Sequence, residues 1–290
     1  MVDPAPGAEQ YARRRLEELE RRWSRFLPDS DIARLNLAPE ALVVVSPETI
    51  ALFTAMRQAW RLTARRYDPT VLGAINEAGY TRSVCGSGRA SVTAGLAAPQ
   101  GSLDDVTIDR ATSSIGVPTG LGIDAGGIGK GLAADMVVTQ LLEDGTEGAL
   151  VSIGGDLCAA GVAPTQAGWY VNVEDPADSA KDLVTLALDA GGVATSSTLS
   201  RTWLQGDRRH HHVIDPATRT SATTDLVAAT VIAATGWEAE VHATAALLCG
   251  AGQALSYLDS HGLSGIVTTA DGATTMSPAL ESANAERSTG

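Results

Sequence analysis

Residues 122–131 read GIDAGGIGKG, in which five of ten positions are glycine and one is Lys130. A glycine cluster that ends in a lysine is typical of a loop that holds phosphate. The nucleotide-binding P-loop requires G-x-x-x-x-G-K-[ST], but here Asp124 stands at its first glycine and Gly131 at its hydroxyl position. The G-x-G-x-x-G pattern of dinucleotide-binding folds is not present either. The alternative is a tight turn into a helix, where glycines only allow unusual backbone angles.

Composition limits the kinds of ligand that this stretch can serve. The chain has 290 residues, 44% of them hydrophobic, so it can bury a large core. Its formal net charge of −13 argues against nucleic-acid binding, which needs a basic face. Lysine occurs only at positions 130 and 181, so a phosphate ligand depends on local cations, and Lys130 is one candidate. An incidental, solvated lysine is the alternative.

Cysteines and apolar runs indicate a protein without disulfides or membrane spans. Cys85, Cys158 and Cys249 are isolated and odd in number, which predicts neither a disulfide framework nor a zinc site. No run approaches the roughly 20 apolar residues of a membrane helix, and the first residues contain no apolar signal region. We therefore expect a cytoplasmic protein.

Hydrophobic periodicity predicts helices and strands that are clustered rather than regularly alternating. Helices are expected over 9–26, over 47–66 with Ser46 as N-cap, and over 130–143, 237–249 and 251–260. Short β-rich runs cover 149–153, 168–174, 183–188 and 228–233. This order indicates an α+β fold. A single domain over 1–275, or two closely joined subdomains, is expected before a flexible tail over 276–290, and the small, polar stretch 81–102 is predicted as a surface loop.

Seven stretches, taken in order, resemble one enzyme family. They are WSRFLPDSDIARLN (23–36), YDPTVLGAINEAGY (67–80), GIDAGGIGKGLAADM (122–136), SIGGDLCAAG (152–161), ATSS (194–197), HHHVIDPATRT (210–220) and EAEVHATAALLCG (238–250). Together they make the chain similar to the FAD:protein FMN transferases of the ApbE type. The resemblance implies an α+β fold with a mixed, largely antiparallel sheet flanked by helices.

The resemblance also implies an activity. Such enzymes bind FAD with Mg²⁺, split its pyrophosphate, and transfer the FMN half to a Thr or Ser hydroxyl of a partner flavoprotein, which releases AMP. Attack on a phosphoryl group requires positive charge near its oxygens, and a metal ion with positioned donors supplies it. Two alternatives stay open: a FAD pyrophosphatase, with water in place of the acceptor hydroxyl, and a FAD-binding protein without turnover.

Three positions correspond by resemblance to the metal site. They are the carbonyl of Gly127 and the side chains of Glu240 and Thr244, whose four-residue spacing places both on one helical face. Oxygen ligands suit Mg²⁺. The family usually has Asp where this chain has Glu240, which puts the metal preference in question. The alternative for Glu240 is an acid on a helix surface.

His212 stands in HVIDP, where the family has a histidine beside the reacting phosphate. An imidazole, whose unperturbed pKa lies near 6.5, can take the proton of the acceptor hydroxyl. His210 and His211 precede it, so a metal-binding histidine tract is the rival interpretation. Consecutive side chains on a strand point in opposite directions, which argues against a chelate. The family's glycine in the next turn is Arg219 here, so either the turn differs or the arginine tolerates its geometry.

The resemblance assigns the remaining contacts to FAD. Aromatic faces can stack on flat rings, a carboxylate can accept from ribose or adenine, a lysine can meet phosphate, and short hydroxyls can donate to phosphate oxygens. The positions that match are Phe26, Gly79, Tyr80, Asp124, Lys130, Thr195 and Ser196. Phe26 and Tyr80 as core residues, and Thr195 as a strand residue, are the alternatives. The GGD at 154–156 is predicted to be a tight turn near the site rather than a ligand.

Overall fold

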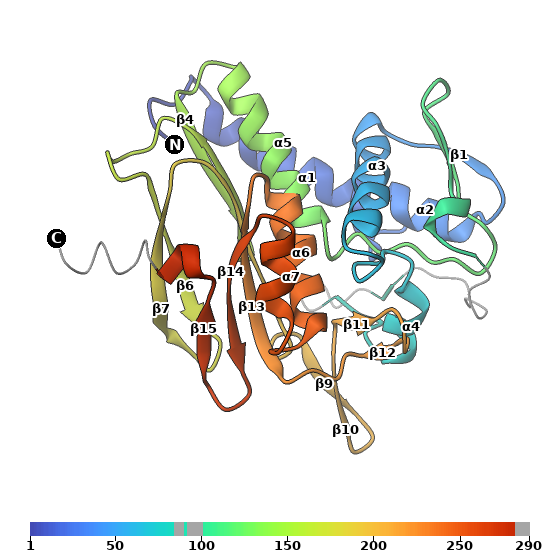
Figure 1. Ribbon diagram of the computed structural model, residues 1–290. Coiled ribbons are helices and arrows are strands. Elements are labelled where there is room, and N and C mark those ends of the chain that lie inside the picture. Colours follow the sequence, from blue (N-terminus) through green and yellow to red (C-terminus); the bar gives the residue numbers. More distant parts are fainter. Residues whose placement is uncertain (84–89, 92–100, 282–290) are drawn as a thin grey trace. The chain divides into compact units, whose positions relative to one another are not determined.

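The computed structural model describes residues 1–83, 90–91 and 101–281 (Figure 1). The chain divides into two compact units, each built from separate segments. Unit 1 contains Met1–Ala12, Lys130–Leu199 and Thr223–Gly290, and unit 2 contains Arg13–Gly129 and Ser200–Ala222. The single domain over 1–275 stays a prediction.

A six-stranded antiparallel sheet forms the centre of unit 1. Its strand order is β15-β14-β13-β8-β5-β4, with β15 Thr274–Met276, β14 Ser264–Thr269, β13 Leu226–Ala233, β8 Gly191–Ser197, β5 Asp156–Gly161 and β4 Gly148–Ile153. The predicted runs at 149–153 and 228–233 are therefore two of its strands.

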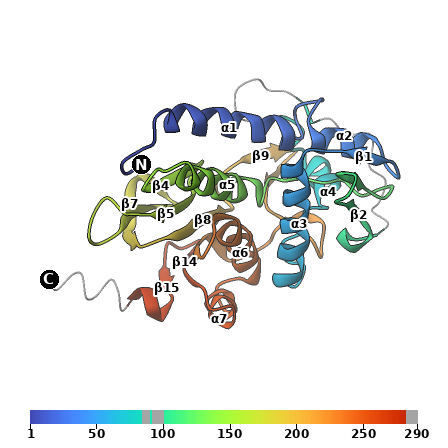
Figure 2. The ribbon, with the colours of Figure 1, turned by 90° about the horizontal axis from the view of Figure 1, so that it is seen from above.

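The two faces of this sheet are covered by different elements. Val193 and Ala194 are neighbours on β8, so their side chains point to opposite faces. Ala194 packs against α6 (Gly236–Cys249), which with α7 (Ala254–Ser260) covers one face; Figure 2 shows both helices nearly end-on. Val193 packs against the β6–β7 hairpin (Trp169–Asp175 and Asp178–Leu188).

Glycines bring the start of α5 (Gly129–Glu143) against the start of α6 within unit 1. A Cβ built on Gly131 overlaps the carbonyl oxygen of Gly236 and lies 2.6 Å from the amide nitrogen of Trp237. A Cβ on Gly192 of β8 lies 2.5 Å from the Cα of Gly236. Asp135 of α5 accepts hydrogen bonds from the amides of Gly236 and Trp237, at 2.7 and 3.0 Å, so its carboxylate faces the positive end of α6.

Unit 2 combines helices with short antiparallel sheets. Its helices are α1 (Ala8–Trp23, which begins in unit 1), α2 (Asp31–Leu37), α3 (Pro47–Leu62), α4 (Leu72–Glu77) and the 3-10 turn η1 (Leu103–Asp105). A three-stranded sheet has the order β1-β3-β2, formed by β1 Leu42–Val44, β3 Ser114–Gly116 and β2 Thr107–Asp109. Two hairpins follow in the later segment: β9–β10 (Thr202–Gln205 and Arg208–His211) and β11–β12 (Ile214–Asp215 and Thr220–Ser221).

The helix predictions agree with the observed elements, and the N-cap prediction at Ser46 is confirmed. Its side chain accepts from the amide of Thr49, and Asp31 of α2 accepts hydrogen bonds from the hydroxyls of both residues. Most of the predicted loop 81–102 lies outside the described residues, as do Cys85 and positions 282–290 of the predicted tail. Within unit 1, Leu280 packs against the apolar cluster beneath β6–β7.

No helix in the described part of the chain has the length and hydrophobicity to cross a membrane.

Candidate functional site

A buried charge cluster in unit 1 contains the lysine of the glycine-rich stretch. The ammonium of Lys130 donates to Oδ2 of Asp156 and, at 2.6 Å, to Oε1 of Glu240. The Glu240 residue is only 3% exposed, and its Oε2 accepts from the amide of Gly131 at 2.8 Å. Asp156 also accepts from the amide of Thr195 at 3.1 Å. One cation is thus shared by two buried carboxylates.

Burial and charge act in opposite directions in this cluster. Burial raises the pKa of Glu240; the Lys130 ammonium partly offsets this rise, and the Asp156 carboxylate adds to it. Burial lowers the pKa of Lys130, but the charges of Glu240 and Asp156 outweigh burial and raise the pKa overall. Lys130 therefore stays protonated near neutral pH and supplies the positive charge that the two carboxylates need.

Hydroxyl groups lie beside the carboxylates. Glu240 and Thr244 are one turn apart on α6, and the hydroxyl of Thr244 donates to the backbone carbonyl of Glu240 at 3.4 Å. Oγ1 of Thr244 lies 2.9 Å from Oγ of Ser196, and Oγ1 of Thr195 lies 2.8 Å from that of Thr230. The hydroxyls of Thr195 and Ser196 on β8 therefore both have protein partners.

The donor chemistry of this cluster fits Mg²⁺, which prefers hard oxygen ligands. Glu240, Thr244 and Ser196 offer such oxygens, and each Glu240 carboxylate oxygen retains a lone pair beyond its single hydrogen bond. Gly127, the third predicted ligand, belongs to unit 2. The complete metal set stays a prediction.

Lys130→Ala is expected to lower the free energy of unfolding by about 3–5 kcal/mol, because it leaves two buried carboxylates without their cation. Lys181→Ala is the matched control, since Lys181 is the chain's other lysine, 72% exposed, and pairs only at the surface with Asp178. That control should cost at most about 1 kcal/mol. Urea denaturation measures both variants, and equal midpoints would show that the Lys130 ammonium does not stabilise the fold.

In unit 2, the start of the glycine-rich stretch is a turn built around Asp124. Oδ1 of Asp124 accepts from the amide of Gly126 at 3.0 Å, and Oδ2 lies 3.7 Å from Nε of Arg25. A Cβ on Gly127 would lie 3.3 Å from the Tyr67 ring, closer than ordinary contact. The backbone here is therefore fixed by local hydrogen bonding and by a neighbouring ring.

Aromatic side chains gather in unit 2 around two predicted flavin contacts. The Phe26 and Tyr80 rings meet edge to face at 6.0 Å, and the guanidinium of Arg25 lies 4.4 and 4.8 Å from their centroids. Trp203 stacks on Tyr80 at 5.4 Å and donates to the carbonyl of Ala78. A Cβ on Gly79, the third predicted contact, would lie 3.0 Å from Nε1 of Trp203. Trp203 thus covers part of Tyr80, and stacking of Tyr80 on a ring of FAD stays a prediction.

The three consecutive histidines have different partners. Nδ1 of His212 lies 3.3 Å from the carbonyl oxygen of Ser200, and Nε2 of His211 lies 3.1 Å from that of Ala222. The ring of His210 stacks on Trp203, with centroids 6.3 Å apart. Within the ranges that the structure describes, no three His, Cys, Asp or Glu side chains are grouped to hold a metal. The histidine-tract interpretation gains no support.

Arg219 occupies the turn at which the resemblance implies a glycine, and it adopts the left-handed conformation with φ +57°. Its amide donates to the carbonyl of Asp215 at 2.7 Å, and the Asp215 carboxylate accepts from the amide of Ala217 at 2.9 Å. The arginine therefore tolerates the geometry of the turn at a cost in backbone strain of order 1 kcal/mol.

The structure assigns the predicted site residues to the two units separately. Unit 1 holds Lys130, Thr195, Ser196, Glu240 and Thr244, which form one cluster; unit 2 holds Phe26, Gly79, Tyr80, Asp124, Gly127 and His212. Sequence reasoning missed three side chains in these clusters, Arg25, Asp156 and Trp203. Asp156 was predicted only as part of a turn, although a lysine buried in an acidic protein requires carboxylate partners.

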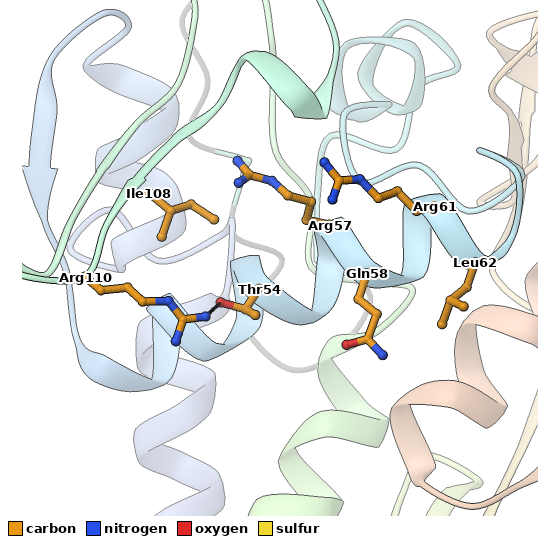
Figure 3. Close-up of a pocket in the computed structure, with 7 residues that line it drawn as sticks. All are labelled: Thr54, Arg57, Gln58, Arg61, Leu62, Ile108 and Arg110. Atoms are coloured by element: carbon orange, nitrogen blue, oxygen red, sulfur yellow. Dashed lines mark hydrogen bonds between the residues drawn. The ribbon is translucent and has the colours of Figure 1, made fainter.

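A separate hollow of about 400 Å³ lies in unit 2 between α3 and the segment around β2 (Figure 3). Its lining residues are Thr54, Arg57, Gln58, Arg61, Leu62, Ile108 and Arg110, none of them predicted site residues. Arg57 donates to the carbonyl of Val106, Arg61 to Asp104, and Arg110 to the hydroxyl of Thr54. These arginines therefore connect α3 to the segment that packs on it.

The glycine-rich stretch 122–131 and the cluster around Lys130 both lie within a region that matches a protein-family model. A family model described as the ApbE family matches residues 2–267. The chain belongs to the ApbE family. Among ApbE relatives, the FAD:protein FMN transferase of Treponema pallidum is 31% identical over 157 residues, covering 49% of this chain and 43% of that protein. The FAD:protein FMN transferase of Escherichia coli K12 is 30% identical over 164 residues, covering 55% and 47%. The match spans about half the length of these relatives.

Another relative and two solved structures extend the comparison. The FAD:protein FMN transferase of Vibrio cholerae is 27% identical over 252 residues, covering 82% of this chain and 72% of that protein. The ApbE protein of Thermotoga maritima has a TM-score of 0.82 at 24% identity, covering 95% of this chain and 90% of that one. The apo flavinyl transferase ApbE of Pseudomonas stutzeri has a TM-score of 0.78 at 23% identity, covering 97% and 90%. This likeness confirms the predicted α+β fold.

Proposed function

We propose that the chain catalyses Mg²⁺-dependent transfer of FMN from FAD to a threonine or serine hydroxyl of an acceptor flavoprotein, with release of AMP. The observation that carries the proposal is the ApbE family match over residues 2–267. The relatives named FAD:protein FMN transferase support it. The oxygen-rich cluster of unit 1 adds chemical support. Phosphoryl transfer by so acidic a protein needs a local cation, and oxygen ligands suit Mg²⁺.

In this proposal the site residues have two tasks, holding the metal ion and binding FAD. The Gly127 carbonyl, Glu240 and Thr244 would hold Mg²⁺, which when bound supplies positive charge near the phosphate oxygens. Lys130 orients the Glu240 carboxylate through its 2.6 Å hydrogen bond and limits the negative charge of the pair with Asp156. Phe26, Gly79, Tyr80 and Asp124 bind FAD, with Thr195 and Ser196 as hydroxyl donors to its phosphates.

His212 is the proposed general base. A carbonyl oxygen only accepts, so the contact with Ser200 favours the tautomer with its proton on Nδ1 and places the basic lone pair on Nε2. The acceptor hydroxyl gives its proton to Nε2 while its oxygen bonds to the phosphorus of the FMN half. The bond from that phosphorus to the bridging oxygen breaks, and AMP leaves with the bridging oxygen.

Incubation of the protein with FAD, Mg²⁺ and a threonine-containing acceptor peptide tests the proposal. We expect AMP and flavinylated peptide to form in equal amounts, as measured by chromatography and mass spectrometry respectively. EDTA should stop the formation of both products. AMP with free FMN in the absence of peptide would instead identify a FAD pyrophosphatase. Bound, intact FAD under all conditions would identify a binding protein without turnover.

A further inference from the structure

The β9–β10 hairpin presents an unusual surface in unit 2. Leu204 is 73% exposed, more than any other large hydrophobic residue in the described part of the chain. Arg209 lies directly opposite Leu204 in the strand register, so both side chains belong to the same face of the hairpin. Trp203 and His210, the next register pair, belong to the other face, which packs toward Tyr80. One face of the hairpin is thus anchored and the other is exposed.

The hairpin segment carries three exposed arginines and one exposed acid, Asp207 of its turn, although the whole chain has a net charge of −13. Arg201, Arg208 and Arg209 are all exposed. Among the residues that the structure describes, none of these three guanidiniums forms an ion pair, whereas Arg15, Arg21 and Arg22 of α1 all pair with glutamates. Arg209 makes a long hydrogen bond of 3.4 Å with the hydroxyl of Thr202. Most of the hydrogen-bonding capacity of these arginines is directed to solvent.

The hairpin is also tied to the proposed catalytic base. Strand β10 ends at His211, so the next residue along the chain is His212. The His212 ring contacts the carbonyl of Ser200, just before β9 begins at Thr202. The β9–β10 hairpin is therefore directly adjacent in the chain to His212, the proposed general base.

We propose that the face of this hairpin formed by Leu204 and Arg209, together with the exposed Arg201 and Arg208 beside it, docks the acceptor flavoprotein through an acidic segment that also carries an apolar side chain. The inference rests on the proposed function. Charge complementarity selects the partner: three unpaired cations favour carboxylates, and Leu204 loses exposed apolar surface on contact. A segment docked there delivers its threonine or serine beside His212, the residue that follows β10.

The direct test measures binding of short fluorescein-labelled peptides by fluorescence anisotropy, without FAD. One peptide has a single central threonine flanked by aspartates and a leucine, and its twin has lysines in place of the aspartates. We expect the acidic peptide to bind at least about tenfold more tightly than its twin, with an affinity that falls as salt is added. Equal binding of the two peptides would overturn the proposal.

Arg208→Glu with Arg209→Glu should weaken binding of the acidic peptide about tenfold or more, because attraction is replaced by repulsion. Arg14→Glu with Arg21→Glu on exposed positions of α1 is the matched control, since it makes the same change in net charge. We expect the control to bind the peptide as the original chain does. Equal losses in both double variants would show a general charge effect and overturn the docking surface.

Two further readouts separate this proposal from the proposed function. Calorimetry should give unchanged FAD affinity for the hairpin variant; a matching loss of FAD affinity would assign the arginines to FAD instead. In the transfer assay, KM for the acidic peptide should rise about tenfold while kcat stays the same. Peptide binding that depends on the hairpin, without any AMP formation by the original chain, would contradict the transferase activity but leave the docking surface in place.

Discussion

Gly131→Ala is expected to leave little folded protein. The added methyl group would overlap the Gly236 carbonyl and lie 2.6 Å from the Trp237 amide, and these are backbone atoms that cannot rotate away. The starts of α5 and α6 would have to separate, which disturbs the Asp135 cap and the Gly131 hydrogen bond to Glu240. Overpacking of a close contact costs roughly 1–3 kcal/mol and more when backbone must move, so we expect a loss above about 4 kcal/mol.

The expected destabilisation by Gly131→Ala is opposite in sign to the effect that helix propensity predicts. Helix propensity alone predicts that alanine stabilises a helix by about 1 kcal/mol over glycine. Gly129→Ala is the matched control in the same helix, because a Cβ there meets Ala125 at 3.6 Å and Trp23 at 3.8 Å, which are ordinary contacts. Thermal and urea unfolding should show Gly129→Ala near the original stability and Gly131→Ala far below it. A stabilised Gly131→Ala variant would mean that the two helices do not approach this closely.

His212→Ala is expected to reduce the rate of FMN transfer by roughly 10²–10⁴-fold, the usual contribution of a general base. FAD affinity should change little, because the imidazole acts on the acceptor hydroxyl. Single-turnover assays of AMP release measure the first quantity, and calorimetry measures the second.

His210→Ala provides the comparison for this prediction. His210 stacks on Trp203 and lies 3.3 Å from the hydroxyl of Ser221, so its removal should mainly loosen the hairpin and retain most of the turnover. Equal losses of rate at positions 210 and 212, restored by added metal, would instead favour the metal-binding histidine tract.

Local signals explain which parts of the fold could be predicted. Ser46 and Pro47 mark the start of α3 through capping, and apolar spacing marks α1, α5 and α6. Strand β8 is not among the predicted β-rich runs, although Thr195 as a strand residue is one of the alternatives, because it begins with two glycines, which disfavour strands by propensity. Gly192 is needed there because the Thr235–Gly236 backbone passes within 2.5 Å of the position of its missing Cβ. Tertiary packing decides that strand, and no local pattern reports it.

In the candidate site, too, local patterns could be predicted from the sequence and long-range contacts could not. Glu240 and Thr244 could be paired from sequence because a helix fixes residues four apart on one face. Lys130 was predicted to meet phosphate, yet its two carboxylate partners lie 26 and 110 residues away along the chain. Such long-range pairing depends on how α5, β5 and α6 pack within unit 1. A phosphate contact for Lys130 stays a prediction beside its observed role between two acids.

Because each unit is built from separate segments of the chain, neither unit can be completed early during synthesis on the ribosome. Unit 2 lacks its second segment until residue 222 has been made, and the sheet of unit 1 lacks β13, β14 and β15 until residue 276. Strands β4, β5 and β8 are complete once residue 197 has been made, and the edge of β8 that pairs with β13 then has no partner until Leu226–Ala233 follow. Exposed strand edges promote aggregation. We therefore expect the unpaired edge of β8 to be prone to aggregation in the nascent chain until β13 has been made.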